Sequence, residues 1–113
     1  MNHAEISYVD VVIADGAATS AEADLSNGRT LIGLLFGAGV DNTAMTFTTA
    51  PNSGGTFVPV YNVDGGSAYG ITVGASRFVP VQVDVFAGLR YLKLVGGGNE
   101  SGAQTVRLVC RNV

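Results

Sequence analysis

One histidine and one cysteine are the side chains of this sequence best suited to acid–base or nucleophilic chemistry. His3 lies in the first few residues, which are usually poorly ordered, and no Ser-His-Asp or Cys-His arrangement includes it. Cys110 lies on the same face of an expected strand as Val106 and Leu108, so we expect a buried, inert thiol. A lone cysteine also excludes an internal disulfide. The sequence therefore predicts a protein that is not an enzyme.

Three aspartates near expected loops, Asp41, Asp64 and Asp84, have the right side chains to bind calcium. None of them has EF-hand spacing, and Asp64 precedes two glycines, a pattern that turn geometry explains by itself. The Gly-Ala-Gly stretch at 37–39 is not a dinucleotide-binding motif, because the next position of that motif is occupied by Asn42. We therefore expect no metal ion and no other cofactor.

The composition indicates a single domain with a surface that a partner covers. Charged residues make up 13% of the 113 residues and apolar residues 47%, whereas about 25% of an ordinary soluble domain is charged. The six cations are scattered singly over a chain of net charge −3, which argues against nucleic acid as a partner. The longest apolar run, 31–40, contains three glycines and is too short to span a membrane. We expect a homo-oligomer, a dimer or trimer, or a complex with another protein.

Clusters of glycine with Asn, Asp and Ser separate short apolar segments along the chain, which is typical of an all-β protein. Turns such as 26–28 and 64–66 contain residues that tolerate positive φ. We predict a single antiparallel β-sandwich domain over 6–113, jelly-roll or discoidin-like, with a flexible polar arm at 1–5 and no helix. Its nine expected strands are 6–14, 20–25, 30–36, 44–49, 57–63, 68–73, 77–83, 89–95 and 104–112.

Three of these strands have unusual patterns. The strand at 30–36 is apolar on both parities, which predicts cover on both sides. Pro80 cannot donate a ladder hydrogen bond, so the strand at 77–83 is expected at a sheet edge. In the strand at 89–95, Arg90 shares its parity with two leucines and is expected to reach an acidic partner such as Asp84 from the rim of the core. Lys93 is then expected on the outer face.

The order of features from Leu25 to Arg111 resembles a known group of proteins. Leu-Ile-Gly-Leu-Leu at 31–35 is followed by Ala-Met-Thr-Phe-Thr-Thr at 44–49, Ser-Gly-Gly at 53–55, Phe-Val-Pro-Val-Tyr-Asn-Val-Asp-Gly at 57–65, Phe-Ala-Gly-Leu-Arg-Tyr-Leu-Lys-Leu at 86–94 and Thr-Val-Arg-Leu-Val at 105–109. This order resembles small β-sandwich decoration, or cement, proteins of tailed-bacteriophage capsids. It is similar, more distantly, to the discoidin-like carbohydrate-binding sandwich.

The phage resemblance implies a virion structural protein that binds the major capsid protein on the outside of an assembled shell, after synthesis in the host cytoplasm. Alternatives are a phage tail or baseplate accessory, or a module that binds a glycan. Bulky or aromatic side chains that point outward are typical interface anchors. Five residues are therefore candidates for a subunit or capsid interface: Tyr8, Leu35, Phe36, Tyr91 and Lys93.

Overall fold

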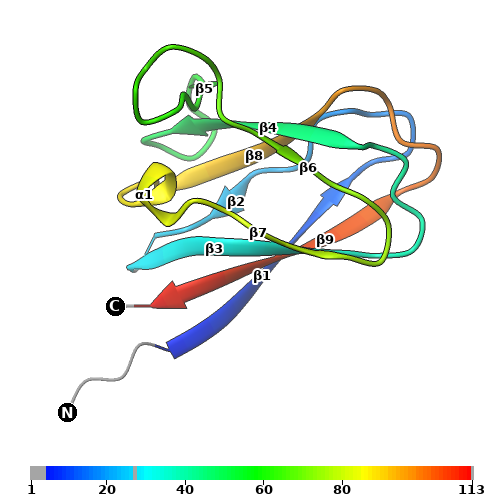
Figure 1. Ribbon diagram of the computed structural model, residues 1–113, viewed down its shortest axis with the longest axis horizontal. Coiled ribbons are helices and arrows are strands. Elements are labelled where there is room, and N and C mark those ends of the chain that lie inside the picture. The colour runs from blue at the N-terminus through cyan, green and yellow to red at the C-terminus, as the bar shows by residue number, and fades with distance from the viewer. Residues whose placement is uncertain (1–4, 27, 113) are drawn as a thin grey trace.

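The computed structural model describes residues 5–26 and 28–112. These residues form nine strands and one short helix, arranged as two packed layers (Figure 1). The elements are β1 (Glu5–Ile13), β2 (Ala23–Asp24), β3 (Arg29–Phe36), β4 (Ala44–Ala50), β5 (Val58–Pro59), β6 (Gly70–Thr72), β7 (Phe78–Pro80), α1 (Val83–Phe86), β8 (Tyr91–Gly96) and β9 (Gln104–Asn112). No described helix is long and apolar enough to cross a membrane.

The two sheets have the strand order of a jelly roll. One sheet has the order β1-β9-β3-β7 and the other β2-β8-β4-β5, with β6 also paired to β4. Early strands pair antiparallel with late ones: β1 with β9, β2 with β8, β3 with β7, and β4 with β5 and β6. This nested pairing, folded over on itself, gives the two Greek keys of a jelly roll. The predicted antiparallel sandwich is thereby confirmed.

The core lies between the sheets and is formed by the inward parity of each strand. Leu92 and Leu94 of β8 face Leu108 and Cys110 of β9, and all four side chains are at most 1% exposed. Three aromatic rings fill one end: Phe86 packs edge-on against Phe47, with ring centroids 4.9 Å apart, and against Tyr69, at 5.5 Å. Aromatic pairs in this T-shaped arrangement stabilise a core beyond the area they bury.

A β-bulge in β3 explains why that strand is apolar on both parities. Leu31 lies opposite Cys110 of β9, but Gly33 lies opposite the next residue, Val109, so Ile32 is an extra residue in β3. A bulge of one residue reverses the side-chain alternation that follows it. Leu31 faces the core before the bulge, and Leu34 and Phe36 face it afterwards. The bulge therefore explains why side chains of both parities are buried, while Leu35 stays on the outer face, where cover by a partner remains a prediction.

The segment after β7 differs from the prediction of an all-strand chain. The alternating valines at 79, 81 and 83 predicted a strand to residue 83, but β7 ends at Pro80 and a single helical turn, α1, follows. Phe86 is fully buried in the aromatic cluster, and the turn places it there. Pro80 does lie in an edge strand, as predicted, because β7 pairs only with β3 among the described strands.

Several predicted boundaries shift as well. The strand expected at 57–63 is reduced to β5 and a bridge between Tyr61 and Ala68, and that at 20–25 is reduced to β2. The predicted arm at 1–5 falls mostly on residues 1–4, which lie outside the described residues, while Glu5 already pairs with Asn112. Positive φ values at Gly28 and Gly65 fit the two turns predicted around them.

Candidate functional site

Strands β1 and β9 form one half of the outer face of the four-stranded sheet. Alternation along β1 turns Ile6, Tyr8, Asp10 and Val12 outward, since Val11 and Ile13 are buried in the core. In the neighbouring strand β9 they lie opposite Arg111, Val109, Arg107 and Thr105, respectively. Apolar and charged side chains therefore alternate along this part of the face.

The other half of the same face comes from β3 and β7. Leu35 follows the bulge and points outward with 43% of its surface exposed, and it pairs with Phe78, which is 50% exposed. The Phe78 ring lies directly over Gly33, where a Cβ atom would overlap the ring. Glycine at this position therefore leaves the space that the Phe78 ring occupies.

Together these residues form a surface that we name the open face. It is defined by Ile6, Tyr8, Asp10, Val12, Leu35, Phe78 and Arg107. It holds five of the nine large hydrophobic side chains that are exposed in the described residues, including Tyr8 at 59%. Apolar side chains that gather on one face, rather than being scattered singly, indicate an interaction surface.

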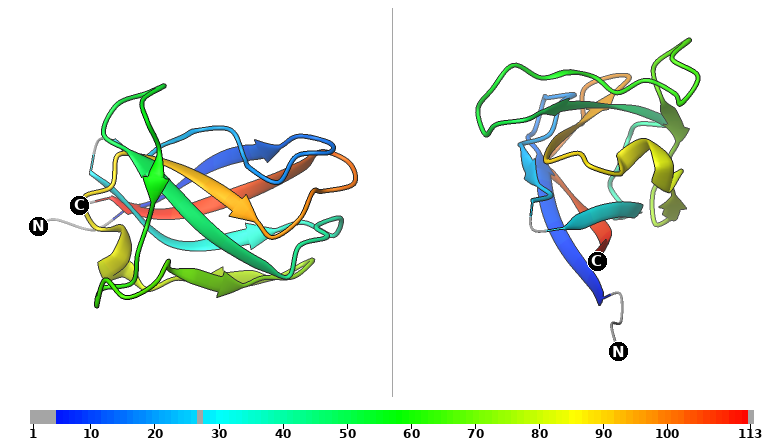
Figure 2. Two further views of the ribbon diagram at one scale, coloured as in Figure 1. Left: turned by 90° about the horizontal axis from the view of Figure 1, so that it is seen from above. Right: turned by 90° about the vertical axis from the view of Figure 1, so that its left-hand side faces the viewer.

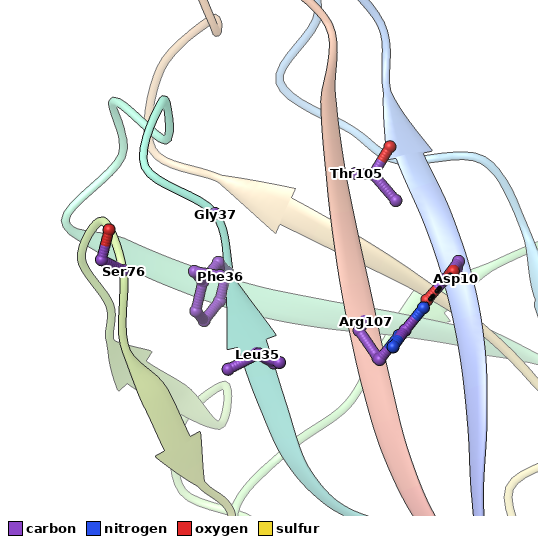
Figure 3. A pocket seen from close by; sticks show the side chains of 7 residues that line it. All are labelled: Asp10, Leu35, Phe36, Gly37, Ser76, Thr105 and Arg107. Atoms are coloured by element: carbon purple, nitrogen blue, oxygen red, sulfur yellow. Dashed lines mark hydrogen bonds and ion pairs between the residues drawn. The ribbon is translucent and has the colours of Figure 1, made fainter.

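An ion pair lies in the middle of the open face. Arg107 donates from Nε to Oδ1 of Asp10 at 2.9 Å and from Nη2 to Oδ2 at 3.2 Å (Figure 3). The hydrogen bond from Arg107 is the main cause that holds the pKa of Asp10 below its ordinary value. Desolvation has the next largest effect and raises the pKa, while the charge of Arg107 has a smaller effect and lowers it. The guanidinium also lies over the Tyr8 ring, 5.2 Å from its centroid.

A hollow of about 420 Å³ lies beside this ion pair. Its walls are Asp10, Thr105 and Arg107 on one side and Leu35, Phe36, Gly37 and Ser76 on the other (Figure 3). Ser76 has a φ of 56° and donates its N–H to the carbonyl of Gly37, which closes one end of the hollow. The hollow therefore combines apolar walls with a few polar groups, as ligand sites do.

The outer face of the five-stranded sheet, which we name the covered face, has a different construction. Thr46 and Thr48 of β4 lie beside Val95 and Lys93 of β8, and all four are half-buried. The loop at 51–57 runs over this side of the sheet (Figure 2). The Lys93 ammonium lies 4.4 Å from the centroid of the Phe57 ring in that loop.

A single carboxylate fastens this loop. Glu22 accepts hydrogen bonds from Ser53 Oγ at 2.6 Å and from the N–H of Gly54 at 2.8 Å. These bonds lower the pKa of Glu22 below its ordinary value, and the bond from Gly54 has the larger effect. The covered face is thus occupied by the chain's own loop.

The structure divides the five candidate interface residues among three places. Tyr8 and Leu35 lie on the open face, while Tyr91 and Lys93 lie half-buried on the covered face. Phe36 does not point outward as expected: it is 2% exposed, because the bulge at Ile32 turns it into the core. An interface role of these residues stays a prediction.

The expected pairing of Arg90 with Asp84 is wrong within the described residues. Arg90 immediately precedes β8. The pKa of Asp24 is lowered mainly by hydrogen bonds from Ser26, then by the charge of Arg29 and, least, by the charge of Arg90. Asp84 lies in the first turn of α1. The sequence predicted Asp84 in a loop after the strand at 77–83, and the structure places it in a helical turn instead.

Sequence reasoning missed Ile6, Asp10, Val12 and Phe78 as members of the open face. The alternation in 6–13 carried the necessary signal, because its even positions are exposed together. It also missed Glu100, a 1%-exposed carboxylate that accepts hydrogen bonds from the backbone N–H groups of Asp41 and Asn42 and from the Asn42 side chain. Glu100 fastens two loops together.

The groups considered for chemistry have structural roles where they are described. Cys110 is buried, and desolvation raises the pKa of its thiol. Asp41 accepts two hydrogen bonds from Ser101, and Asp64 accepts one from the N–H of Gly66. The described residues contain no group of three or more His, Cys, Asp or Glu that could hold a metal ion. His3 lies outside the described residues.

Comparison with known proteins yields a match of fold. No family model matches the chain, and no curated protein matches it in sequence. Among solved structures, it is similar to the crystal structure of the SPBc2 prophage-derived protein YomS, with a TM-score of 0.56 and 11% sequence identity. The match covers 99% of this chain and 99% of the other. The two proteins therefore share the whole two-sheet fold.

Proposed function

We propose that this protein is a structural component of a bacteriophage particle that binds the outside of the assembled capsid and stabilises it. It would bind the major capsid protein through the open face and carry out no chemistry. It would be synthesised in the host cytoplasm and would then attach to the surface of the virion.

The observation that carries this proposal is the composition of the open face. Tyr8, Leu35 and Phe78 expose 43–59% of their surfaces beside an ion pair, in a chain with few charges. Burying a large apolar side chain is worth about 1.5–3 kcal/mol when it is fully exposed beforehand, so each of these contributes part of that amount. A capsid repeats the same contact many times, and a linked or oligomeric binder converts modest contacts into durable attachment.

The fold supports a connection with phages. The full-length match is to a prophage-derived protein, and jelly rolls are frequent in viral capsid proteins and in lectins. Because one fold serves many functions, the fold supports only the connection with phages, and the proposed binding role depends on the open face.

The test is co-sedimentation of the purified protein with empty phage shells. We expect the double variant Leu35→Asp, Phe78→Asp to lose at least tenfold in affinity, about 1.4 kcal/mol, because two half-exposed apolar anchors become charged. Val63→Asp is the matched control, since Val63 is 69% exposed and lies outside the open face. Equal binding by both variants would contradict the proposal, as would wild-type protein that does not bind shells.

A glycan is the alternative ligand that the hollow favours. Asp10, Arg107, Ser76 and Thr105 offer polar groups beside the apolar walls of Leu35 and Phe36. Binding on a glycan array that Arg107→Ala abolishes, without binding to shells, would replace capsid attachment with sugar recognition. Binding to purified tails or baseplates but not to shells would assign the protein to that part of the particle.

A further inference from the structure

The long strand β1 has one side that no other described strand occupies. β1 pairs with β9 over all nine of its residues, and β9 continues to β3 on its other side. On the opposite side of β1, one backbone contact is present in the described residues, in which Val12 accepts a hydrogen bond from the N–H of Ala21 at 2.9 Å. The rest of that edge, from Glu5 to Val11, has no backbone partner among the described residues.

The contact at Val12 fixes the direction of the remaining groups. In an antiparallel strand the N–H and C=O of one residue point to the same side, and alternate residues point the same way. Because the carbonyl of Val12 points away from β9, the N–H and C=O groups of Ile6, Tyr8 and Asp10 do so as well. The register shows no bulge over this length, so these six groups form a regular row.

This edge lacks most of the features that usually prevent strand pairing. Proteins protect edge strands by making them short, or with proline, charged side chains (especially lysine) or a bulge. The other edge of the same sheet follows that rule, since β7 has three residues and contains Pro80. β1 has nine residues, with neither proline nor lysine. The charged residues of β1 are Glu5 and Asp10, and Asp10 is already paired with Arg107 of the same sheet. Figure 1 shows its amino-terminal half extending along the lower side of the molecule.

We propose that β1 pairs antiparallel with β1 of a second copy of this chain, about a two-fold axis at Tyr8. Tyr8 then lies opposite the Tyr8 of the second copy, and Ile6 opposite its Asp10. Ile6, Tyr8 and Asp10 of each copy each exchange two backbone hydrogen bonds with the residue opposite. The two four-stranded sheets then become one continuous sheet of eight strands. An antiparallel edge is its own complement, which is what a two-fold interface requires.

Charge complementarity favours a second copy in this register. Arg111 lies opposite Ile6 in β9, and the Asp10 of the second copy lies on the other side of Ile6. All three side chains are on the outer face, so Arg111 and that Asp10 are two strand spacings apart, roughly 10 Å between backbones. An arginine side chain reaches across this distance, and the axis repeats the contact. The two open faces then lie side by side on the same surface of the dimer.

The first test is the mass of the purified protein by light scattering over a range of concentrations. We expect a dimer whose dissociation constant rises at least tenfold in Tyr8→Pro, because proline removes the donor at the axis on both copies. Its ladder with β9 is preserved, since the N–H of Tyr8 points away from β9. The matched control is Leu35→Lys, which lies on the open face away from the edge and should leave the dimer unchanged. A monomer at every concentration, or a dimer that only Leu35→Lys weakens, overturns the proposal.

Cross-linking tests the register without depending on proline. Tyr8→Cys places two sulfurs at the axis, where paired Cα atoms are about 5.5 Å apart and within disulfide range. Ile6→Cys places them roughly 14 Å apart along the strands, beyond that range. We expect oxidation to link Tyr8→Cys and not Ile6→Cys, with Cys110 buried in both. The reverse result overturns this register. Both tests use the purified protein alone, so their outcome is independent of capsid binding.

Discussion

The open face and the covered face belong to the same sandwich, but the chain treats them in opposite ways. Leu35 and Phe78 point into solvent on the open face, whereas Thr46 and Thr48 occupy the corresponding layer of the covered face. The loop at 51–57, fastened by Glu22, places Phe57 against Lys93, which lies beside Thr48 on this face. The two faces therefore differ in both composition and cover, and this difference is what the proposed binding role of the open face depends on.

The largest expected effect is a difference in stability between substitutions at two neighbouring residues of β3. Leu34 is fully buried and Leu35 is 43% exposed. Leu34→Ala should lower the free energy of unfolding by about 2–5 kcal/mol, because it leaves a cavity between the sheets. Leu35→Ala should change it by roughly 0.5 kcal/mol or less. Denaturant unfolding of both variants measures the difference, and similar losses would mean that Leu35 already has a partner within the fold.

That contrast between neighbours also marks the limit of prediction from the sequence. Alternation in 104–112 and 89–95 predicted the inward leucines correctly, and Pro80 predicted an edge. The bulge at Ile32 could not be read from the sequence, because it depends on the register with β9, which is more than 70 residues away in the chain. One extra residue was enough to turn Phe36 from the expected surface into the core.

The covered face was hidden from sequence reasoning for a related reason. Glu22 and Ser53 are 31 residues apart, and nothing local in either segment indicates their hydrogen bond. Lys93 therefore appeared to be a free outward cation, although the structure places it against Phe57. Local patterns predicted which side of the sheet Lys93 occupies, but only the fold shows that this side is covered.

The next prediction concerns the hydrogen bonds by which Glu22 holds the loop at 51–57. Glu22→Ala should release the loop at 51–57, since the hydroxyl of Ser53 and the N–H of Gly54 lose their acceptor. Hydrogen exchange of the Gly54 amide should accelerate by about tenfold or more, while the amides of β9 keep their protection. Asp10→Ala is the matched control on the open face and should not alter the loop. Unchanged exchange at Gly54 would show that other contacts hold the loop.

A smaller effect is expected from the cation over the Phe57 ring. Lys93→Ala should lower the free energy of unfolding by about 0.5–1 kcal/mol, the range of an exposed cation–π contact. Lys93→Met keeps most of the aliphatic chain and should separate the contribution of charge from that of packing. If Lys93 instead anchors an external partner, either variant would weaken binding to shells and the covered face would have to be counted as part of the interface.

The smallest effect is the response of the two faces to acid. The pKa values of Asp10 and Glu22 lie below their ordinary values of 3.8 and 4.5, the first chiefly through the hydrogen bond from Arg107 and the second through the N–H of Gly54. A carboxylate with a lowered folded-state pKa stabilises the fold above its unfolded-state pKa, and this contribution is lost as the pH falls through the folded-state value.

The stabilising contribution of Glu22 should therefore decline below pH 4.5 and that of Asp10 below pH 3.8, and each contact should be lost as the pH falls through the lowered pKa of its carboxylate. An NMR titration that follows the carboxyl carbons of Asp10 and Glu22 together with the Gly54 amide would measure both steps. The Gly54 amide should titrate with Glu22 and lose its titration in Glu22→Gln. Co-titration with Asp10 instead would mean that the two faces are coupled through the core. The open face would then sense whether the covered face is closed.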